Sequence, residues 1–124
     1  MARRSTSAKD AGAEPDDFGN EVLLRGRVRS DAELRELPSG TALVTLRVVV
    51  PRSQPDPSGR KASDWVDCAV WSARLRARLG GWRAGDLVEV RGSLRRRFYR
   101  AGGDTGTRLE VEVSGGRMLR RASS

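Results

Sequence analysis

Residues 64–81 read DWVDCAVWSARLRARLGG, which predicts a β-strand followed directly by a short helix. Over 64–71 every second residue suits a core, as in a strand with one buried face. Those inward residues are Val66, Cys68 and Val70. Leu75 and Leu79 then lie four residues apart, on one face of a helix that Gly80 and Gly81 end. Such a helix could cover one end of a small barrel, with its arginines pointing outward.

Two predicted strands precede this unit. Residues 22–29 alternate between an apolar inner face and an arginine-rich outer face, and Gly26 in their middle indicates a bend or bulge of the kind that coils a strand into a barrel. Residues 41–50 are apolar on nearly both faces, so we expect another subunit to cover part of the outer face. The segments 30–40 and 51–63 are rich in turn residues and are predicted to be connections.

Two more predicted strands follow, over 86–99 and 108–113, joined by a glycine-rich hairpin tip at 100–107. Their alternation gives inward parity to one set of apolar side chains. These are Val88, Val90, Leu94, Phe98, Leu109, Val111 and Val113. Phe98 is therefore predicted to be structural. Trp82, at the turn into the fourth strand, is predicted to lie in the core or in an interface.

Three strands, one short helix and two strands follow one another along the chain. This is the order of the oligonucleotide/oligosaccharide-binding (OB) barrel, an all-β, five-stranded fold with its helix between strands three and four. We expect this domain over residues 20–121, after a disordered polar leader at 1–19 and before a short tail at 122–124.

The composition favours a polyanionic partner and argues against catalysis. The chain has 124 residues and a net charge of +8, and all but Lys9 and Lys61 of its 24 basic residues are arginine. Nucleic acid or an anionic membrane surface would suit this charge, although an arginine-biased genome would also produce it. Without histidine, and with Cys68 alone, the usual general bases, zinc sites and disulfides are excluded. We expect no enzymatic activity, no cofactor and no metal.

The same sequence predicts a cytoplasmic location, on the nucleoid. The N-terminus has no apolar segment of the signal-peptide kind, and its acidic residues argue against a transit peptide. No stretch approaches the ~20 apolar residues of a transmembrane helix, so we expect no membrane contact.

Trp65 and Trp71 emerge on the outer face of a strand whose inner face already supplies the core. Exposed tryptophans are costly unless a partner covers them. Single-stranded nucleic acid is such a partner, because its bases stack on aromatic rings while cations neutralise its phosphates. The candidate phosphate-binding residues are Arg25, Arg27, Arg47, Arg52, Arg60, Lys61, Arg95 and Arg97. The alternatives are packing under the helix, a loop or another subunit for either tryptophan, and a solvated charge for any one arginine.

From Asn20 to about Leu119 the chain resembles the bacterial single-stranded DNA-binding protein family. The matching segments are, in order, NEVLLRGRV, ELPSGTALVTLRVVV, DWVDCAVWSARLRARL, GDLVEVRGSLRRRFY and RLEVEV. The resemblance implies an OB fold that binds single-stranded DNA without sequence preference. It also implies a homo-oligomer, with a tetramer favoured over a dimer. By the same resemblance Trp65, Trp71 and Tyr99 stack on bases; Tyr99 by itself would suggest packing at the hairpin base.

The chain departs from the family pattern in two places. Many members carry a further stacking aromatic in the loop after strand two, whereas here no aromatic occurs between Val50 and Asp64, and Gln54 lies near the expected place. Housekeeping members end in a flexible linker and an acidic tip, whereas this sequence ends RMLRRASS. We therefore expect a short paralogue, without tail-mediated recruitment of repair enzymes.

The sequence leaves other functions open beside sequence-independent binding and protection of single-stranded DNA. A protein-interaction subunit of a replication-restart or nucleoprotein complex, binding nucleic acid secondarily, would suit the missing tail and loop aromatic. An RNA-binding protein on the same fold is a third possibility. An enzyme is the weakest alternative, because the carboxylates have no metal-site context and no evident pocket.

Overall fold

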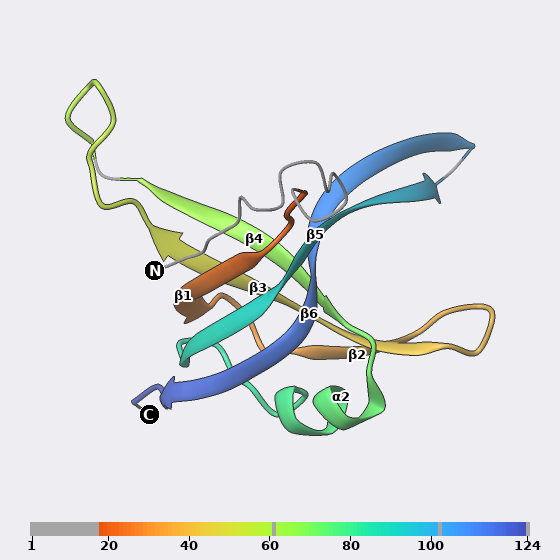
Figure 1. Ribbon diagram of the computed structural model, residues 1–124. Helices are drawn as coiled ribbons and strands as arrows, with labels where there is room; N and C mark the ends of the chain where they lie inside the picture. The colour runs from red at the N-terminus through yellow and green to blue at the C-terminus, as the bar shows by residue number, and fades with distance from the viewer. Residues whose placement is uncertain (1–17, 61, 102, 124) are drawn as a thin grey trace, which may run out of the picture.

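The computed structural model describes residues 18–60, 62–101 and 103–123; the side chains of residues 99–101 and 104 lie outside this description. In this part of the chain six strands and one helix follow one another (Figure 1). Their bounds are β1 Val22–Val28, β2 Glu33–Glu36, β3 Ala42–Pro51, β4 Ser63–Val70, α2 Ala73–Leu79, β5 Leu87–Ala101 and β6 Asp104–Arg120.

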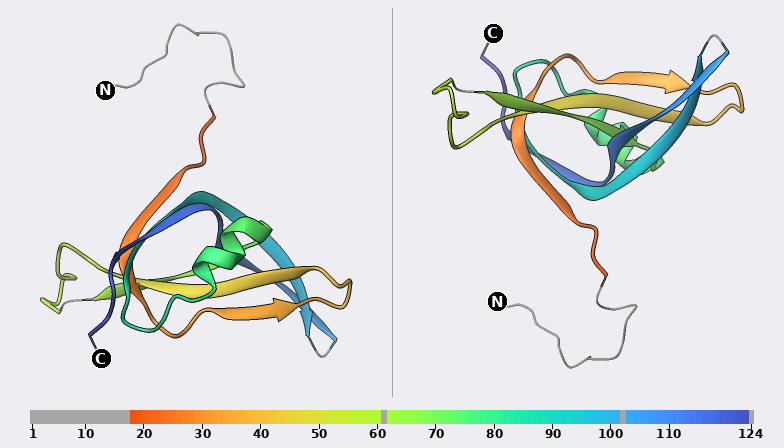
Figure 2. Two further views of the ribbon diagram at one scale, coloured as in Figure 1. Left: turned by 90° about the horizontal axis from the view of Figure 1, so that it is seen from below. Right: turned by 90° about the horizontal axis from the view of Figure 1, so that it is seen from above.

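The strands pair around a single curled sheet (Figure 2). Strand β1 pairs antiparallel with β5, β5 with β6, and β4 with β3, while β6 runs parallel to β4. Strand β1 also pairs with β3, opposite Val48 and Val49, so the series returns to its first strand. The helix lies between β4 and β5 in the chain, and Ser72 caps its start by accepting the N–H of Leu75. This topology confirms the predicted all-β OB fold.

One strand was missed by the sequence prediction. The predicted connection 30–40 contains β2, which pairs with β3 from Glu33 opposite Thr45 to Glu36 opposite Ala42. All four β2 residues are exposed and three are charged, so the segment shows no alternation of apolar and polar side chains. A short, charged edge strand of this kind protects a sheet edge from pairing with other chains.

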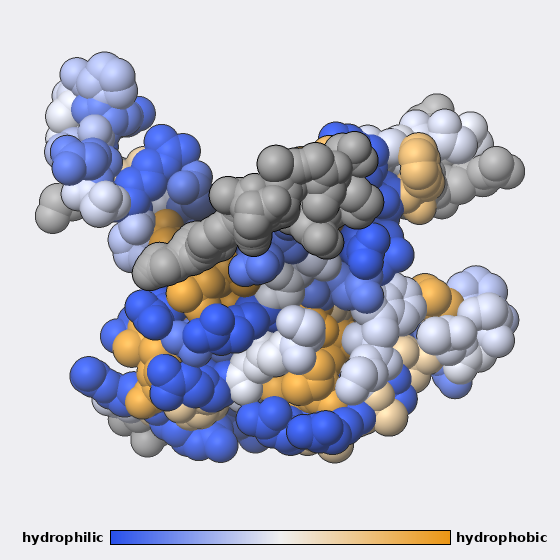
Figure 3. Space-filling model, in the orientation of Figure 1, coloured by the Kyte–Doolittle hydropathy of each residue, from blue (hydrophilic) through white to orange (hydrophobic). Residues whose placement is uncertain are grey.

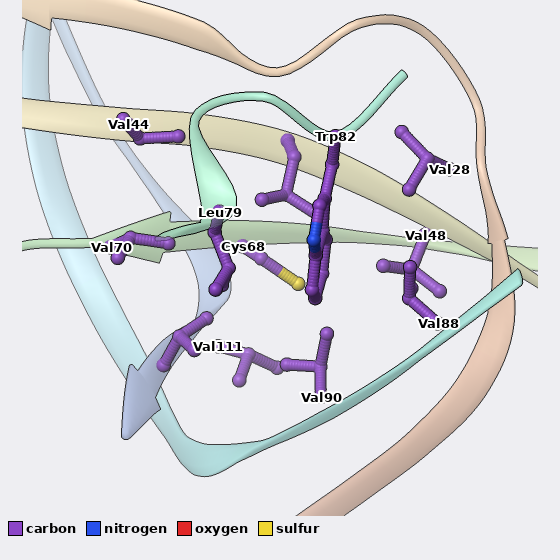
Figure 4. Packing of buried hydrophobic residues seen from close by; sticks show 12 residues of the cluster. Val28, Val44, Val48, Cys68, Val70, Leu79, Trp82, Val88, Val90 and Val111 are labelled. Atoms are coloured by element: carbon purple, nitrogen blue, oxygen red, sulfur yellow. The ribbon is translucent and has the colours of Figure 1, made fainter. Parts of the chain in front are cut away.

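The core is built mainly from valines on the inner faces of the strands, and it includes Trp82 (Figure 4). Trp82 is only 5% exposed, so its predicted place in the core is confirmed. Leu79 reaches the same cluster from α2, as its spacing predicts for a helix that covers the barrel end. Burial raises the pKa of the Cys68 thiol to about 12, so this cysteine is a core residue and not a nucleophile.

The outer face of β3 is partly covered within the single chain. Leu43, which has outward parity, is only 7% exposed, and Ala69 on the outer face of β4 is 1% exposed. Leu43 stands opposite Arg35 of β2, the strand that the sequence did not predict. Leu43 is therefore buried within a single chain, and coverage of the partly exposed remainder of this face by another subunit stays a prediction.

Strands β5 and β6 are longer than predicted, and their outer halves form a hairpin arm beyond the barrel (Figure 1). We define the arm as residues 93–101 and 103–112. Inward parity does not lead to burial in its outer part: Leu94 is 41%, Phe98 82% and Leu109 50% exposed, whereas Val111, where β6 still pairs with β4, is buried. The predicted structural role of Phe98 is therefore wrong, because the barrel has ended before the strand reaches it.

Two glycines allow strands to approach closely. A methyl group on Gly26 would overlap the carbonyl oxygen of Val49 where β1 crosses β3, and one on Gly92 would overlap the carbonyl oxygen of Glu112. At Gly26 the pairing of β1 with β5 continues without a register shift, so the residue serves this close approach. No helix in the described part of the chain is long and apolar enough to cross a membrane.

We expect Gly26→Ala to lower the free energy of unfolding by about 1–3 kcal/mol, because the added methyl group forces β1 away from β3. Urea unfolding followed by circular dichroism measures this change. Gly115→Ala is the matched control, since a methyl group there meets no atom within 4 Å. The control should stay within about 0.5 kcal/mol of the parent. An equal loss in both variants would contradict the close approach at Gly26.

Candidate nucleic-acid interface

Trp65 is the most exposed tryptophan of the chain, and two arginines contact its ring. Its side chain on β4 is 56% exposed. The guanidinium carbon of Arg29 lies 4.3 Å from the centroid of the indole ring, and that of Arg47 lies 4.9 Å from it. These are cation–π distances. Trp65, Arg29 and Arg47 thus combine an aromatic surface with two positive charges at one place.

The chain itself holds Arg47 over the ring. Arg47 on β3 stands opposite Asp67 on β4, and its Nε donates to Oδ1 of Asp67 over 2.7 Å. Asp67 has the same parity as Trp65, two residues along the strand. The guanidinium is therefore fixed between a carboxylate and an indole. Sequence reasoning gave Arg47 a role but missed Asp67, for which alternation along β4 was the available signal.

Arg29 was also not among the predicted site residues. It follows β1 directly, and its backbone N–H donates to the carbonyl of Arg47 over 2.8 Å, which extends the pairing of β1 with β3. This bond brings Arg29 to the side of Trp65. Its outward parity with Arg25 and Arg27 was visible in the sequence, but its proximity to Trp65 depends on β1 crossing β3.

Trp71 is more enclosed than Trp65. It follows the last residue of β4 and is half-buried. Its carbonyl accepts a hydrogen bond from the guanidinium of Arg76, so Arg76 turns back toward the chain rather than outward as predicted. Its indole N–H is buried and has no hydrogen-bond partner among the described residues. Trp71 therefore offers a ligand less free surface than Trp65 does.

Arg97 connects Trp71 to the hairpin arm. Its guanidinium carbon lies 5.1 Å from the centroid of the Trp71 ring. The same guanidinium bonds Glu110 over 2.9 Å and Glu112 over 3.3 Å, and Arg95 pairs with Glu112 over 3.1 Å. Both predicted phosphate-binding arginines of the arm thus already have acidic partners, in partly exposed pairs worth about 0–1 kcal/mol each.

We define the tryptophan–arginine face as the surface that joins these groups. Its members are Arg29, Arg47, Trp65, Asp67, Trp71 and Arg97. A groove of about 230 Å³ lies beside Asp67 of β4 and is lined by Arg47 of β3 and by Arg108 and Glu110 of β6. Its lining also includes Asp31, Glu33 and Arg35, so acidic and basic side chains meet in this groove.

The remaining predicted phosphate-binding residues lie elsewhere. Arg27 donates to the carbonyl of Gly85 over 2.9 Å, and Arg25 turns to Glu89 on β5. In the loop after β3, Arg52 bonds Asp64 and lowers the pKa of that carboxyl, first through this hydrogen bond and then through its charge. Arg60 is exposed in the same loop.

Two predicted residues cannot be placed fully. Lys61 lies outside the described residues. The backbone of Tyr99 lies in β5 opposite Gly106, but its side chain lies outside the description.

A second group of arginines surrounds Glu89, which is only 3% exposed. Glu89 accepts from Nε of Arg117 over 3.0 Å and from Nε of Arg25 over 2.7 Å. These hydrogen bonds, with that of Arg117 the larger cause, lower the pKa of Glu89 to about 2. Arg74 and Arg78 of α2 line the adjoining pocket of about 730 Å³. This group joins β1, β5 and β6 and includes neither tryptophan of the tryptophan–arginine face.

The fold and this face together define the class of protein. It is a small OB-fold protein whose outer surface presents an exposed indole with two guanidinium groups beside its ring. The model of the single-strand binding protein family matches residues 19–119. The chain belongs to the single-strand binding protein family.

Curated relatives and a solved structure support this assignment. Single-stranded DNA-binding protein 3 of Streptococcus agalactiae is 35% identical over 81 residues, covering 64% of this chain and 58% of that protein. The single-stranded DNA-binding protein of Bacillus cereus is 32% identical over 92 residues, covering 74% of this chain and 53% of the relative. The chain thus spans about half the length of the curated relatives it matches.

A structure of the Plasmodium falciparum SSB complex with ssDNA superimposes with a TM-score of 0.67. It covers 84% of this chain and 96% of that chain, at 20% identity, which is a likeness of fold.

The Glu89 group predicts a specific acid dependence of stability. Because the folded-state pKa is depressed from 4.5 to about 2, the carboxylate contributes its stability above about pH 4.5 and loses it as the pH falls toward 2. Glu89→Gln should therefore be less stable than the parent at neutral pH, and this difference should shrink below pH 4.5. Urea unfolding at stepped pH measures it. A difference that stays constant with pH would contradict the assigned cause.

Proposed function

We propose that the chain binds single-stranded DNA without sequence preference, through the tryptophan–arginine face. The observation that carries the proposal is Trp65, more than half exposed, with Arg29 and Arg47 beside its ring. A base stacked on an aromatic side chain covers its apolar surface, and neighbouring guanidinium groups can bind the phosphates on either side. Every base has a π-face, so such a surface binds with little regard to sequence.

The ion pairs of the face are compatible with this function. Those of Arg47 with Asp67 and of Arg97 with Glu110 have arginine side chains 38% exposed. The Asp67 carboxylate is also 36% exposed, and exposed pairs are weak, so a phosphate can replace it as the partner of Arg47. Glu110 is only 12% exposed, so a phosphate at Arg97 adds to this pair and does not replace it. Until DNA arrives, the carboxylates keep the arginines in position. This arrangement reduces the side-chain freedom that binding would otherwise remove.

The separation of the tryptophans sets the scale of the DNA path. Trp65 and Trp71 are six residues apart, which corresponds to about 20 Å of extended chain. A DNA strand that contacts the rings of both tryptophans must pass the groove lined by Arg47, Arg108 and Glu110. Trp65, Trp71 and Tyr99 are the proposed stacking residues, and Arg29 joins the phosphate-binding residues predicted from the sequence.

The proposal also covers the absence of catalysis, the oligomeric state and the cellular location. The chain acts without catalysis, as a homo-oligomer with a tetramer favoured, on DNA in the cytoplasm. Membership of the family and the names of the curated single-stranded DNA-binding relatives support DNA binding without catalysis. The oligomeric state and the location are proposed from the family resemblance. Sedimentation measures the oligomeric state, and a stable monomer would contradict that part of the proposal.

We expect Trp65→Ala to weaken binding of a fluorescein-labelled oligo(dT) by about 1–3 kcal/mol, because one stacking surface is lost. Fluorescence anisotropy at low salt measures the affinity, and quenching of the parent's tryptophan fluorescence by poly(dT) gives an independent readout. Leu34→Ala is the matched control, an apolar side chain 72% exposed on the edge strand β2. No quenching and no binding by the parent would overturn the proposed function and favour a protein-interaction role.

Binding should also weaken with salt in proportion to the phosphates that are neutralised. The slope of log K against log salt should be about −0.7 per phosphate for a single strand. Arg29→Ala should make this slope shallower by about 0.7, because one guanidinium beside Trp65 is lost. Titrations at several salt concentrations measure it. Arg74→Ala, on α2 and lining the pocket beside Glu89 rather than the groove, is the control, and equal changes in both variants would argue against a specific role for Arg29.

A further inference from the structure

The hairpin arm has a second surface that the proposed face does not use. Directly opposed residues of antiparallel strands lie on the same side of the sheet. The register pairs Leu94 with Val111, Arg96 with Leu109 and Phe98 with Thr107. Leu94, Arg96, Phe98 and Leu109 therefore share one side, opposite the side of Arg95 and Arg97. We call this side the apolar arm face.

This face is open to solvent and aromatic at its outer end. Phe98 is 82% exposed, the largest value of any phenylalanine, tyrosine or tryptophan side chain described within a strand. Leu94 and Leu109 are 41% and 50% exposed. Apolar surface interrupts the polar surface of the arm in Figure 3. A phenylalanine in this position neither packs in the core nor supports the barrel.

The two sides of the arm differ in their acidic residues. The side of Arg95, Arg97 and Arg108 also carries Glu110 and Glu112, which pair with Arg97 and Arg95. The apolar arm face has no carboxylate among its described side chains, and Arg96 contributes a positive charge there. The guanidinium of Arg96 donates to the hydroxyl of Thr107 over 3.2 Å, which holds it beside Phe98. An aromatic ring next to an arginine with no competing acid is suited to a base and its phosphate.

The arm is also thin enough for one strand of DNA to contact both sides. Strand β1 pairs with β5 only as far as Gly92, and β4 pairs with β6 only at Val111 and Glu112, so from the Arg95–Glu110 pair outward the described part of the arm is a two-stranded ribbon. Arg97 contacts Trp71 on one side, and Phe98, the next residue, points to the other side. A DNA strand that leaves Trp71 therefore has to pass around only the edge of this two-stranded ribbon to reach Phe98.

We propose that Phe98 is a further base-stacking residue, and that single-stranded DNA passes around the arm from Trp71 to the apolar arm face. This inference rests on the proposed function. The partner is DNA and not a second copy of the chain, because facing copies would bring two Arg96 guanidinium groups together. Three partly exposed apolar side chains also fall short of the ~1,200–2,000 Å² buried in a standard protein interface.

The test compares Phe98→Leu with Phe98→Tyr. Leucine keeps an apolar side chain but has no ring to stack, whereas tyrosine keeps the ring. Phe98→Leu should bind a long labelled oligo(dT) roughly 5- to 150-fold more weakly than the parent, the range that loss of one stacked base produces. Phe98→Tyr should bind as the parent does.

The length of the DNA identifies the site. With oligo(dT) of graded length, the effect of Phe98→Leu should appear only once the DNA is long enough to pass Trp71 and reach the arm. Trp65→Ala should weaken binding at all lengths. Leu34→Ala, at a side chain 72% exposed on β2, should have no effect at any length. Circular dichroism of each variant verifies that it is folded.

Three results would contradict the inference or the proposed function, and they can be told apart. If the parent binds oligo(dT) and Phe98→Leu binds equally well at every length, Phe98 is not a stacking residue, although the proposed function stands. If Phe98→Leu changes the sedimentation coefficient and leaves DNA affinity unchanged, the face is a contact between protein copies, and the inference is overturned. If the parent itself does not bind at low salt, the proposed function fails first.

Discussion

The whole molecule depends on the way in which β1 crosses β3 while it pairs with β5. Gly26 allows this crossing, because any side chain there would overlap the backbone of β3. The crossing curls the strands around a valine core, into which α2 inserts Leu79 and the turn after it inserts Trp82. It also carries Arg29 from the end of β1 to the ring of Trp65. The contact that closes the fold and the contact that builds the candidate binding face are thus the same.

The positions of individual arginines and acids matter more for the candidate binding face than the net charge of the chain does. A charge of +8 suggests free arginines, but Asp67 and Glu110 hold the guanidinium groups of Arg47 and Arg97 beside the two tryptophans. These acids lower the local positive charge and at the same time fix the arginines near the rings. Such a face attracts a polyanion less strongly than free arginines would. Its arginines are already in position, however, so binding costs less side-chain entropy.

The hairpin arm shows where alternation along a strand stops predicting burial. Within the barrel, even-numbered residues of β5 such as Val88 and Val90 are fully buried. In the arm the same parity continues through Leu94 to Phe98, but no sheet or helix stands opposite. Among the described side chains, carboxylates lie on one side of the arm only, and the large apolar residues lie on the other. Within the barrel one face of β5 is therefore part of the core. In the arm the continuation of the same face is exposed to solvent and available for binding.

The sequence by itself determined five of the six strands, the position of the helix between β4 and β5, and the outward direction of Trp65. All of these follow from local spacing, because alternation and four-residue repeats are properties of neighbouring residues. It missed β2, whose charged residues show no apolar period, and it misplaced Phe98, since parity carries no information on where the barrel ends.

Only the tertiary structure decided which arginines meet which ring. Arg29, Arg47 and Trp65 come from three strands, and their proximity depends on strand register and on the crossing of β1 over β3. The same holds for Arg25, which was predicted to contact phosphate and instead bonds Glu89 across β1 and β5. Long-range pairing fixes these contacts, and no spacing along the chain encodes them.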